Sequence, residues 1–72
     1  MTGFICSSEL KSTDTKNYHI SVTEHYEGYD DSIRYYVNVL SWETAEDIVD
    51  DEYNSLYDAI KAYRQLVKQY AA

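Results

Sequence analysis

The alternation of apolar and polar residues is clearest in two stretches near the middle of the chain. In residues 18–26, one predicted face carries Tyr18, Ile20, Val22 and Tyr26. In residues 33–42, one predicted face carries Ile33, Tyr35, Val37 and Val39. A period of two predicts two half-buried strands, and the polar turn at residues 27–32 joins them as an antiparallel hairpin. Leu40 and Trp42 depart from the alternation, so we expect a bulge or twist there.

The C-terminal stretch, residues 55–70, has a different period. Its apolar residues recur at helical spacing: Leu56, Ala59, Ile60, Tyr63, Leu66, Val67 and Tyr70. Ser55 followed three residues later by Asp58 matches the capping box, in which the hydroxyl accepts a hydrogen bond from an early backbone N–H. Lys68 lies in the last turn, where a cation is favoured. The pattern predicts an amphipathic helix with one apolar stripe.

The segment between strands and helix, residues 43–54, fits two patterns. As a strand over 48–53, it directs Val49 and Tyr53 inward after a turn at 43–47. As a helix, it places Trp42, Ala45, Val49 and Tyr53 near one face, with Ser41 as a possible cap. We favour the strand, because a lone two-stranded hairpin is marginally stable and a third strand widens the surface for the helix.

The first 17 residues give a weaker pattern. Phe4, Ile5 and Cys6 are consistent with either a short edge strand or an arm against the core, and residues 11–17 are polar and typical of a turn. The chain is therefore predicted to be one α+β domain over residues 1–72, with the arm or edge strand at 1–17, the sheet at 18–54 and the helix at 55–70. The sheet is a three-stranded antiparallel meander with the C-terminal helix packed on one face.

This fold assigns side chains to three surfaces. The helix contributes to the core Leu56, Ile60, Tyr63, Leu66 and Val67. The sheet contributes Ile20, Val22, Ile33, Val37 and Val39. The opposite face of the sheet is polar and partly aromatic, with His19, Thr23, His25, Arg34, Tyr36 and Asn38.

The distribution of charge along the chain disfavours some classes of binding partner. The 72 residues carry a formal net charge of −7, and residues 1–54 account for −9 while residues 55–72 carry +2. Direct binding to nucleic acid or to an acidic membrane is disfavoured, because both depend on Lys and Arg. The single cysteine, Cys6, excludes an internal disulfide and suits a reducing compartment. No apolar run is long enough to predict a transmembrane helix.

Residues that commonly serve catalysis or metal binding do not form a recognisable set. His19 and His25 are six residues apart on one predicted strand, too far for one metal ion, and Cys6 lies on another segment. Phosphate-binding loops and nucleophile motifs do not occur. We therefore predict a protein that is not an enzyme and has no catalytic residues, metal site or cofactor.

Acidic residues cluster in the hairpin turn and in residues 43–52, which hold six acids and no base. Strand residues two apart project from one face ~6.6–6.8 Å apart, so Asp50 and Glu52 form a pair that can imitate a line of phosphates, with Asp51 on the opposite face. Tyrosines beside them can act as aromatic anchors. The predicted partner-binding residues are Glu27, Tyr29, Asp30, Asp31, Tyr36, Glu43, Glu46, Asp47, Asp50, Asp51, Glu52 and Tyr53. The open alternative is that the acidity serves only solubility.

The chain resembles the small phage-borne inhibitors of bacterial defence, anti-CRISPR proteins in particular. The resemblance lies in its size, its acid clusters at 27–31 and 43–52, its tyrosine content and its lack of a catalytic motif. The resemblance implies a monomer in the cytoplasm of a bacterial host. It implies a basic nucleic-acid-binding protein or CRISPR effector complex as partner, with target DNA blocked by DNA mimicry. The alternative is a cellular protein–protein interaction module, antitoxin-like or a regulatory subunit, that binds through the helix surface at Tyr57, Arg64 and Gln65.

Overall fold

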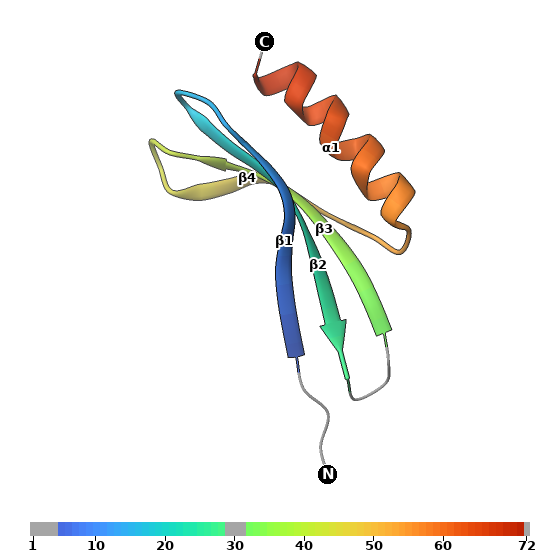
Figure 1. The fold of residues 1–72 in the computed structure, drawn as a ribbon. Coiled ribbons are helices and arrows are strands. Elements are labelled where there is room, and N and C mark those ends of the chain that lie inside the picture. Colours follow the sequence, from blue (N-terminus) through green and yellow to red (C-terminus); the bar gives the residue numbers. More distant parts are fainter. Residues whose placement is uncertain (1–4, 29–31, 72) are drawn as a thin grey trace.

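The fold is α+β, with an antiparallel sheet and one C-terminal helix on one of its faces (Figure 1). The computed structural model describes residues 5–28 and 32–71. Within these ranges the elements are β1 (Ile5–Asp14), β2 (Tyr18–Glu27), β3 (Ser32–Ser41), β4 (Glu46–Tyr53) and α1 (Leu56–Tyr70). The strands form one sheet in the order β1-β2-β3-β4, so each strand pairs with its neighbour in sequence.

The predicted number of three strands is wrong, because the N-terminal segment adds a fourth. β1 pairs with β2 from Ile5 opposite Glu27 to Asp14 opposite His19, so Lys11–Asp14 continue the strand instead of forming a turn. Residues 6–12 of β1 are exposed. A sheet edge tolerates this polar composition, and the sequence therefore lacks the alternation that marks a half-buried strand.

The strand predicted at residues 48–53 is confirmed as β4, and the helical interpretation of this segment is wrong. Val49 lies opposite Val39 and Tyr53 opposite Tyr35, so both side chains join the helix-covered face. Cross-strand contacts between β-branched and aromatic side chains stabilise a sheet. These contacts with β3 explain why the apolar residues of this segment favour a strand.

The core lies between α1 and the middle of the sheet (Figure 1). Its fully or nearly buried side chains are Ile20, Val22, Val37, Val39, Ala59 and Tyr63. Around them pack partly buried residues that include Ile60, Leu66 and Val67. The predicted cap is confirmed: the Ser55 side chain accepts a hydrogen bond from the Asp58 backbone N–H at 3.4 Å.

Two residues that we expected in the core, Ile33 and Leu56, are instead about half exposed, at 45% and 46%. β1, β2 and β3 extend beyond the N-terminal end of α1, so the helix covers only part of their length (Figure 1). Ile33 lies on this uncovered extension, and Leu56 is the first residue of the helix. Both residues have the expected pattern, but the lengths of the elements leave them outside the packed region.

Each edge strand contains one irregularity at an apolar residue. In β1, Glu9 lies opposite Thr23 and Lys11 opposite Val22, so Leu10 is the extra residue of a bulge. In β4, Asp47 lies opposite Leu40 and Val49 opposite Val39, so Ile48 is the extra residue. The irregularity expected near Leu40 is thus confirmed, with the extra residue on the partner strand. A bulge reverses the alternation of side chains beyond it.

The β3–β4 connection is a tight turn whose last residue, Ala45, has a positive φ of 59°. The Ala45 backbone N–H donates to the Ser41 carbonyl at 2.8 Å and closes the turn. Left-handed backbone is uncommon outside glycine, asparagine and aspartate. Residues 42–45 of this turn, including Glu43, are exposed at one end of the sheet.

Candidate functional site

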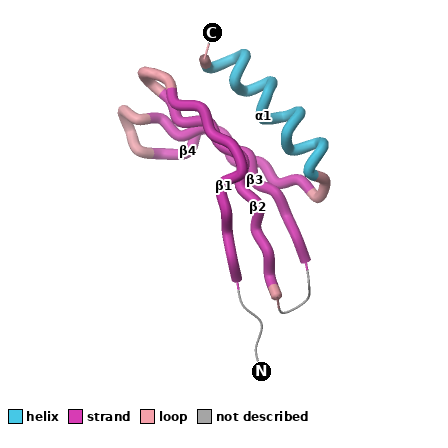
Figure 2. Tube along the Cα trace, in the orientation of Figure 1, coloured by secondary structure: helices cyan, strands magenta, loops and turns pink. Residues whose placement is uncertain are grey.

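The face of the sheet opposite α1 carries no helix or strand layer from the described residues (Figure 2). We call it the open face. As predicted, its side chains alternate with the buried ones of β2 and β3, and they include His19, Thr23, His25, Arg34, Tyr36 and Asn38. This face is a mixed polar and aromatic surface rather than a second core.

Three carboxylates of β4 line the edge of the open face. Asp47, Asp50 and Glu52 lie opposite Leu40, Asn38 and Tyr36, all of which point away from the helix. We call these three residues the acidic row. The expected placement of Asp50 and Glu52 on one face, with Asp51 on the other, is confirmed. Asp47 joins them because the bulge at Ile48 reverses the alternation between residues 47 and 49.

The members of the acidic row differ in their partners. Glu52 Oε2 lies 3.3 Å from Arg34 Nε, and Asp47 Oδ1 accepts a hydrogen bond from Asn38 Nδ2 at 3.3 Å. Asp50 is exposed and has no hydrogen bond or ion pair with a residue in the described ranges. In the row, the Asp50 carboxylate without a partner thus lies between Asp47 and Glu52, which are partly engaged. The negative charge that no cation offsets is at the Asp47–Asp50 end, away from Arg34.

Tyr36 is held beside this row by its neighbours on the open face. Its ring meets that of His25 edge to face, with centroids 5.8 Å apart. A hydrogen bond with Tyr36 and the charge of Glu52 raise the pKa of Arg34. His25 is itself held by Ser7 Oγ at 2.9 Å from Nδ1 and by Glu27 Oε1 at 3.5 Å from Nε2. These contacts limit the rotamers of Tyr36 and order an aromatic surface next to the carboxylates.

A second group of acids on the open face surrounds His19. Its Nδ1 lies 2.5 Å from Asp14 Oδ1, and its Nε2 lies 3.2 Å from Glu9 Oε2. Both ring nitrogens can donate hydrogen bonds only when the imidazole is protonated. The hydrogen bond to Asp14 is the main cause that raises the pKa of His19, and burial opposes it. The imidazole also lies 5.6 Å from the ring of Trp42, centroid to centroid.

The remaining predicted site residues are dispersed. Glu43 is exposed in the β3–β4 turn, and Glu46 and Asp51 are exposed on the helix side of β4. Glu27 lies at the far end of β2, beside His25. Tyr53 packs against the core on the helix side, and this contact leaves it apart from Tyr36. The predicted residues Tyr29, Asp30 and Asp31 lie outside the described residues.

Open-face residues outside the predicted site set include Glu9, Asp14, Leu40 and Trp42. Glu9 and Asp14 lie in a segment whose pattern fits either a short edge strand or an arm, followed by a turn, and the bulge at Leu10 hides their common face. Leu40 and Trp42 break the alternation of their strand, and Trp42 also fits the alternative helix over residues 43–54. Trp42 is 48% exposed and follows a strand directly, and an exposed tryptophan at a strand end is a signal for an interaction surface.

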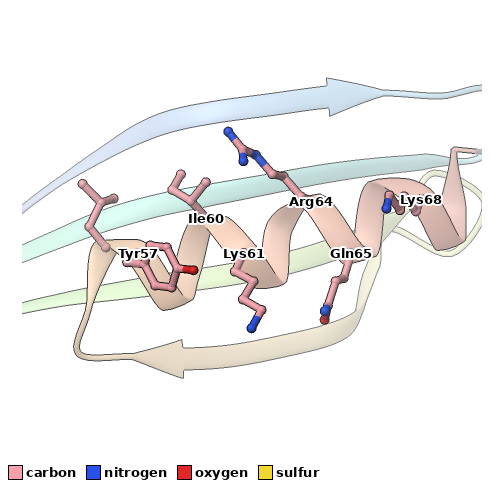
Figure 3. Close-up of a pocket in the computed structure, with 7 residues that line it drawn as sticks. Tyr57, Ile60, Lys61, Arg64, Gln65 and Lys68 are labelled. Atoms are coloured by element: carbon pink, nitrogen blue, oxygen red, sulfur yellow. The ribbon is translucent and has the colours of Figure 1, made fainter.

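On the other side of the molecule, a shallow hollow of about 580 Å³ follows the exposed surface of α1. We call it the helix groove. Its lining residues are Leu56, Tyr57, Ile60, Lys61, Arg64, Gln65 and Lys68. Ile60 and Arg64 project to one side of the helix, and Lys61 and Gln65 to the other (Figure 3). Because the lining contains three cations and no acid, this surface is opposite in charge to the acidic row.

Comparison with protein-family models, curated proteins and solved structures finds no match. The described helix is neither long nor apolar enough to cross a membrane. Among residues 5–28 and 32–71, no three His, Cys, Asp or Glu side chains converge to hold a metal ion. The function must therefore be inferred from the two charged surfaces themselves.

Proposed function

We propose that this protein inhibits a bacterial nucleic-acid-targeting defence complex, as anti-CRISPR proteins do, by presenting carboxylates to a basic DNA-binding surface. The observation that supports this function is the concentration of acids at one end of the sheet. Six acidic residues fall between Glu43 and Glu52, and all six are exposed. Only Glu52 has a basic partner, Arg34, among the described residues.

The proposed mechanism is exclusion of DNA by occupancy. A channel that binds DNA is lined by Lys and Arg, and the acidic row would meet these side chains from one rigid strand. Complementary charge accelerates encounter and sets orientation more than it sets affinity. Tyr36 and Trp42, on the same open face, supply contacts that depend less on salt, because buried aromatic side chains commonly anchor interfaces.

A competition experiment tests this function. CRISPR effector complexes are incubated with a saturating concentration of the protein, and their affinity for target DNA is measured. Asp47→Asn/Asp50→Asn removes two charges from the open face and is expected to weaken inhibition by about tenfold, the equivalent of ~1.4 kcal/mol.

The matched control is Glu46→Gln/Asp51→Asn. It removes the same charge from the same strand but on the helix side, so it should weaken inhibition much less. Equal loss in both variants would show that total charge, not the open face, is recognised. DNA affinity that stays unchanged for every effector at saturation would overturn the proposal.

A second candidate function is an interaction module, antitoxin-like or a regulatory subunit, that binds a cellular protein through α1. The specific observation in its favour is the helix groove with its exposed apolar residues, Leu56 and Tyr57. Binding of this kind should persist at high salt and be lost on Tyr57→Ala. The inhibitor function predicts the reverse for both measurements.

A further inference from the structure

The helix groove gathers basic side chains on one surface of the described structure. Lys61, Arg64 and Lys68 all line it, and they are half of the six basic residues of the chain. None of the three has an ion pair or hydrogen bond with another side chain in the described ranges. Three cations on one helix surface repel one another, and no ion pair in the described ranges offsets this repulsion.

The groove also changes character along its length. At the N-terminal end of α1 it is apolar: Leu56 is 46% exposed, Tyr57 is 74% exposed, and Ile60 lies beside them. Towards the C-terminal end it is cationic, with Arg64 and Lys68 (Figure 3). Large exposed apolar side chains next to unpaired charges are typical of an interaction surface.

We infer that the helix groove binds an acidic peptide segment of a partner protein, with one apolar side chain over Leu56 and Tyr57 and carboxylates over Arg64 and Lys68. The span from residue 56 to residue 68 is ~18 Å at the α-helical rise of 1.5 Å per residue. An extended segment of about five or six residues covers that length. The apolar anchor supplies contact area, and the carboxylates set the direction of the bound segment.

Charge and size favour a peptide over a nucleic acid. A phosphate backbone continues past the groove with one charge per ~1.7 Å of duplex axis, and it would enter the field of the acids on β1 and β4. A short peptide places its few carboxylates only over the cations. A hollow of about 580 Å³ lies within the range of ~300–1,000 Å³ that is typical of small-ligand sites, so it can hold part of a short segment.

This binding site is on the opposite side of the sheet from the acidic row, so it does not depend on the proposed inhibitor function. One molecule can therefore hold an acidic segment on α1 while the open face is engaged. The two sites are separable by mutation, because no residue belongs to both.

The test uses a labelled synthetic peptide that has one leucine followed by a run of aspartates, and fluorescence anisotropy as the readout. The parent protein is expected to bind it, and Arg64→Glu/Lys68→Glu should weaken binding by at least about tenfold. Tyr57→Ala should weaken it by several-fold and should not alter the far-ultraviolet circular dichroism, since Tyr57 is 74% exposed.

The matched control is Lys11→Glu/Lys16→Glu, which makes the same change in net charge on β1 and the β1–β2 turn. If this control weakens binding as much as the groove variant, the peptide responds to overall charge and the inference is wrong. Asp47→Asn/Asp50→Asn should bind the peptide as the parent does, which separates this outcome from failure of the inhibitor function.

Two further outcomes would overturn the inference. The first is tighter binding of single-stranded oligothymidine than of the peptide, which would assign the groove to phosphates. The second is self-association, measured by sedimentation equilibrium, that is abolished by Arg64→Glu/Lys68→Glu and is not inhibited by the peptide. That result would assign the groove to the acidic β3–β4 hairpin of a second copy.

Discussion

At the scale of single residues, His19 is the side chain whose environment departs most from that of an exposed histidine. It lies between Asp14 and Glu9, with Trp42 beside it. These contacts join β1, the turn after β3 and the centre of the sheet through one imidazole. Because the carboxylates favour the protonated ring, the arrangement couples the position of β1 to pH.

The raised pKa of His19 predicts how stability depends on pH. A histidine whose pKa is higher in the folded than in the unfolded state contributes fully below its unfolded value of about 6.5. This contribution is lost as the pH rises through the folded value. We expect a lower free energy of unfolding at about pH 8 than at about pH 6.

Urea unfolding followed by the fluorescence of Trp42 measures this difference, since Trp42 is the only tryptophan. His19→Gln should reduce the dependence on pH, and so should Glu9→Gln/Asp14→Asn, which leaves the ring but removes its partners. If the free energy of unfolding of His19→Gln depended on pH as fully as that of the parent, His19 would not be the source of the pH dependence.

At the scale of secondary-structure elements, α1 is tied to the sheet by tyrosines at two places. Tyr63 is 7% exposed, and its hydroxyl lies 2.6 Å from Thr13 Oγ1 on the edge strand β1. Tyr70, at the end of α1, meets Tyr18 edge to face with centroids 5.0 Å apart. The C-terminal half of the helix is thus held over β1 and β2, while Leu56 and Tyr57 at its N-terminal end stay exposed.

Loss of the Tyr63–Thr13 hydrogen bond should cost stability. Tyr63→Phe is expected to lower the free energy of unfolding by about 1 kcal/mol, because it leaves the partly buried Thr13 hydroxyl without this partner. Tyr57→Phe is the control, since Tyr57 is 74% exposed and should show no change.

A double-mutant cycle with Thr13→Val separates the hydrogen bond from packing. The two single substitutions should not be additive, because each removes the same interaction. Additive effects would mean that the two hydroxyls do not interact in solution.

The secondary-structure elements differ in how well the sequence predicts them. The strands at residues 18–27 and 32–41 and the capped helix were predictable, because their apolar residues recur with a period of 2 or 3.6. β1 was not, because its outer side faces solvent and Leu10 interrupts its register. The acidic row was predicted for Asp50 and Glu52, but its continuation to Asp47 depends on a bulge that sequence alternation cannot reveal.

At the scale of the whole molecule, charge is separated across the sheet. The acids of β4 and its turn lie at one end of the sheet, and three of the six, Asp47, Asp50 and Glu52, are on the open face. The cations of α1 lie on the covered side. The separation gives the molecule an electrostatic polarity, which orients it in the field of a partner before contact. It also leaves the acids close to one another, at a cost in stability.

Removal of part of that repulsion should stabilise the fold. Asp47→Asn/Asp50→Asn is expected to raise the free energy of unfolding by about 0.5 kcal/mol in dilute buffer, because fewer like charges remain on one strand. At about 1 M salt the Debye length falls to ~3 Å, and the difference from the parent should disappear. A difference that persists at high salt would point to altered hydrogen bonding instead.

The bulges at Leu10 and Ile48 have a consequence for the sheet as an open structure. A four-stranded sheet has two free edges, and a long regular edge offers its backbone groups to the strand of another molecule. Here each outer strand is interrupted by a bulge, at Leu10 in β1 and at Ile48 in β4, and β4 also carries several carboxylates. The bulges that place additional acids on the open face also make both edges irregular. An irregular edge pairs poorly with a strand of another molecule, so the bulges disfavour growth of the sheet into fibrils.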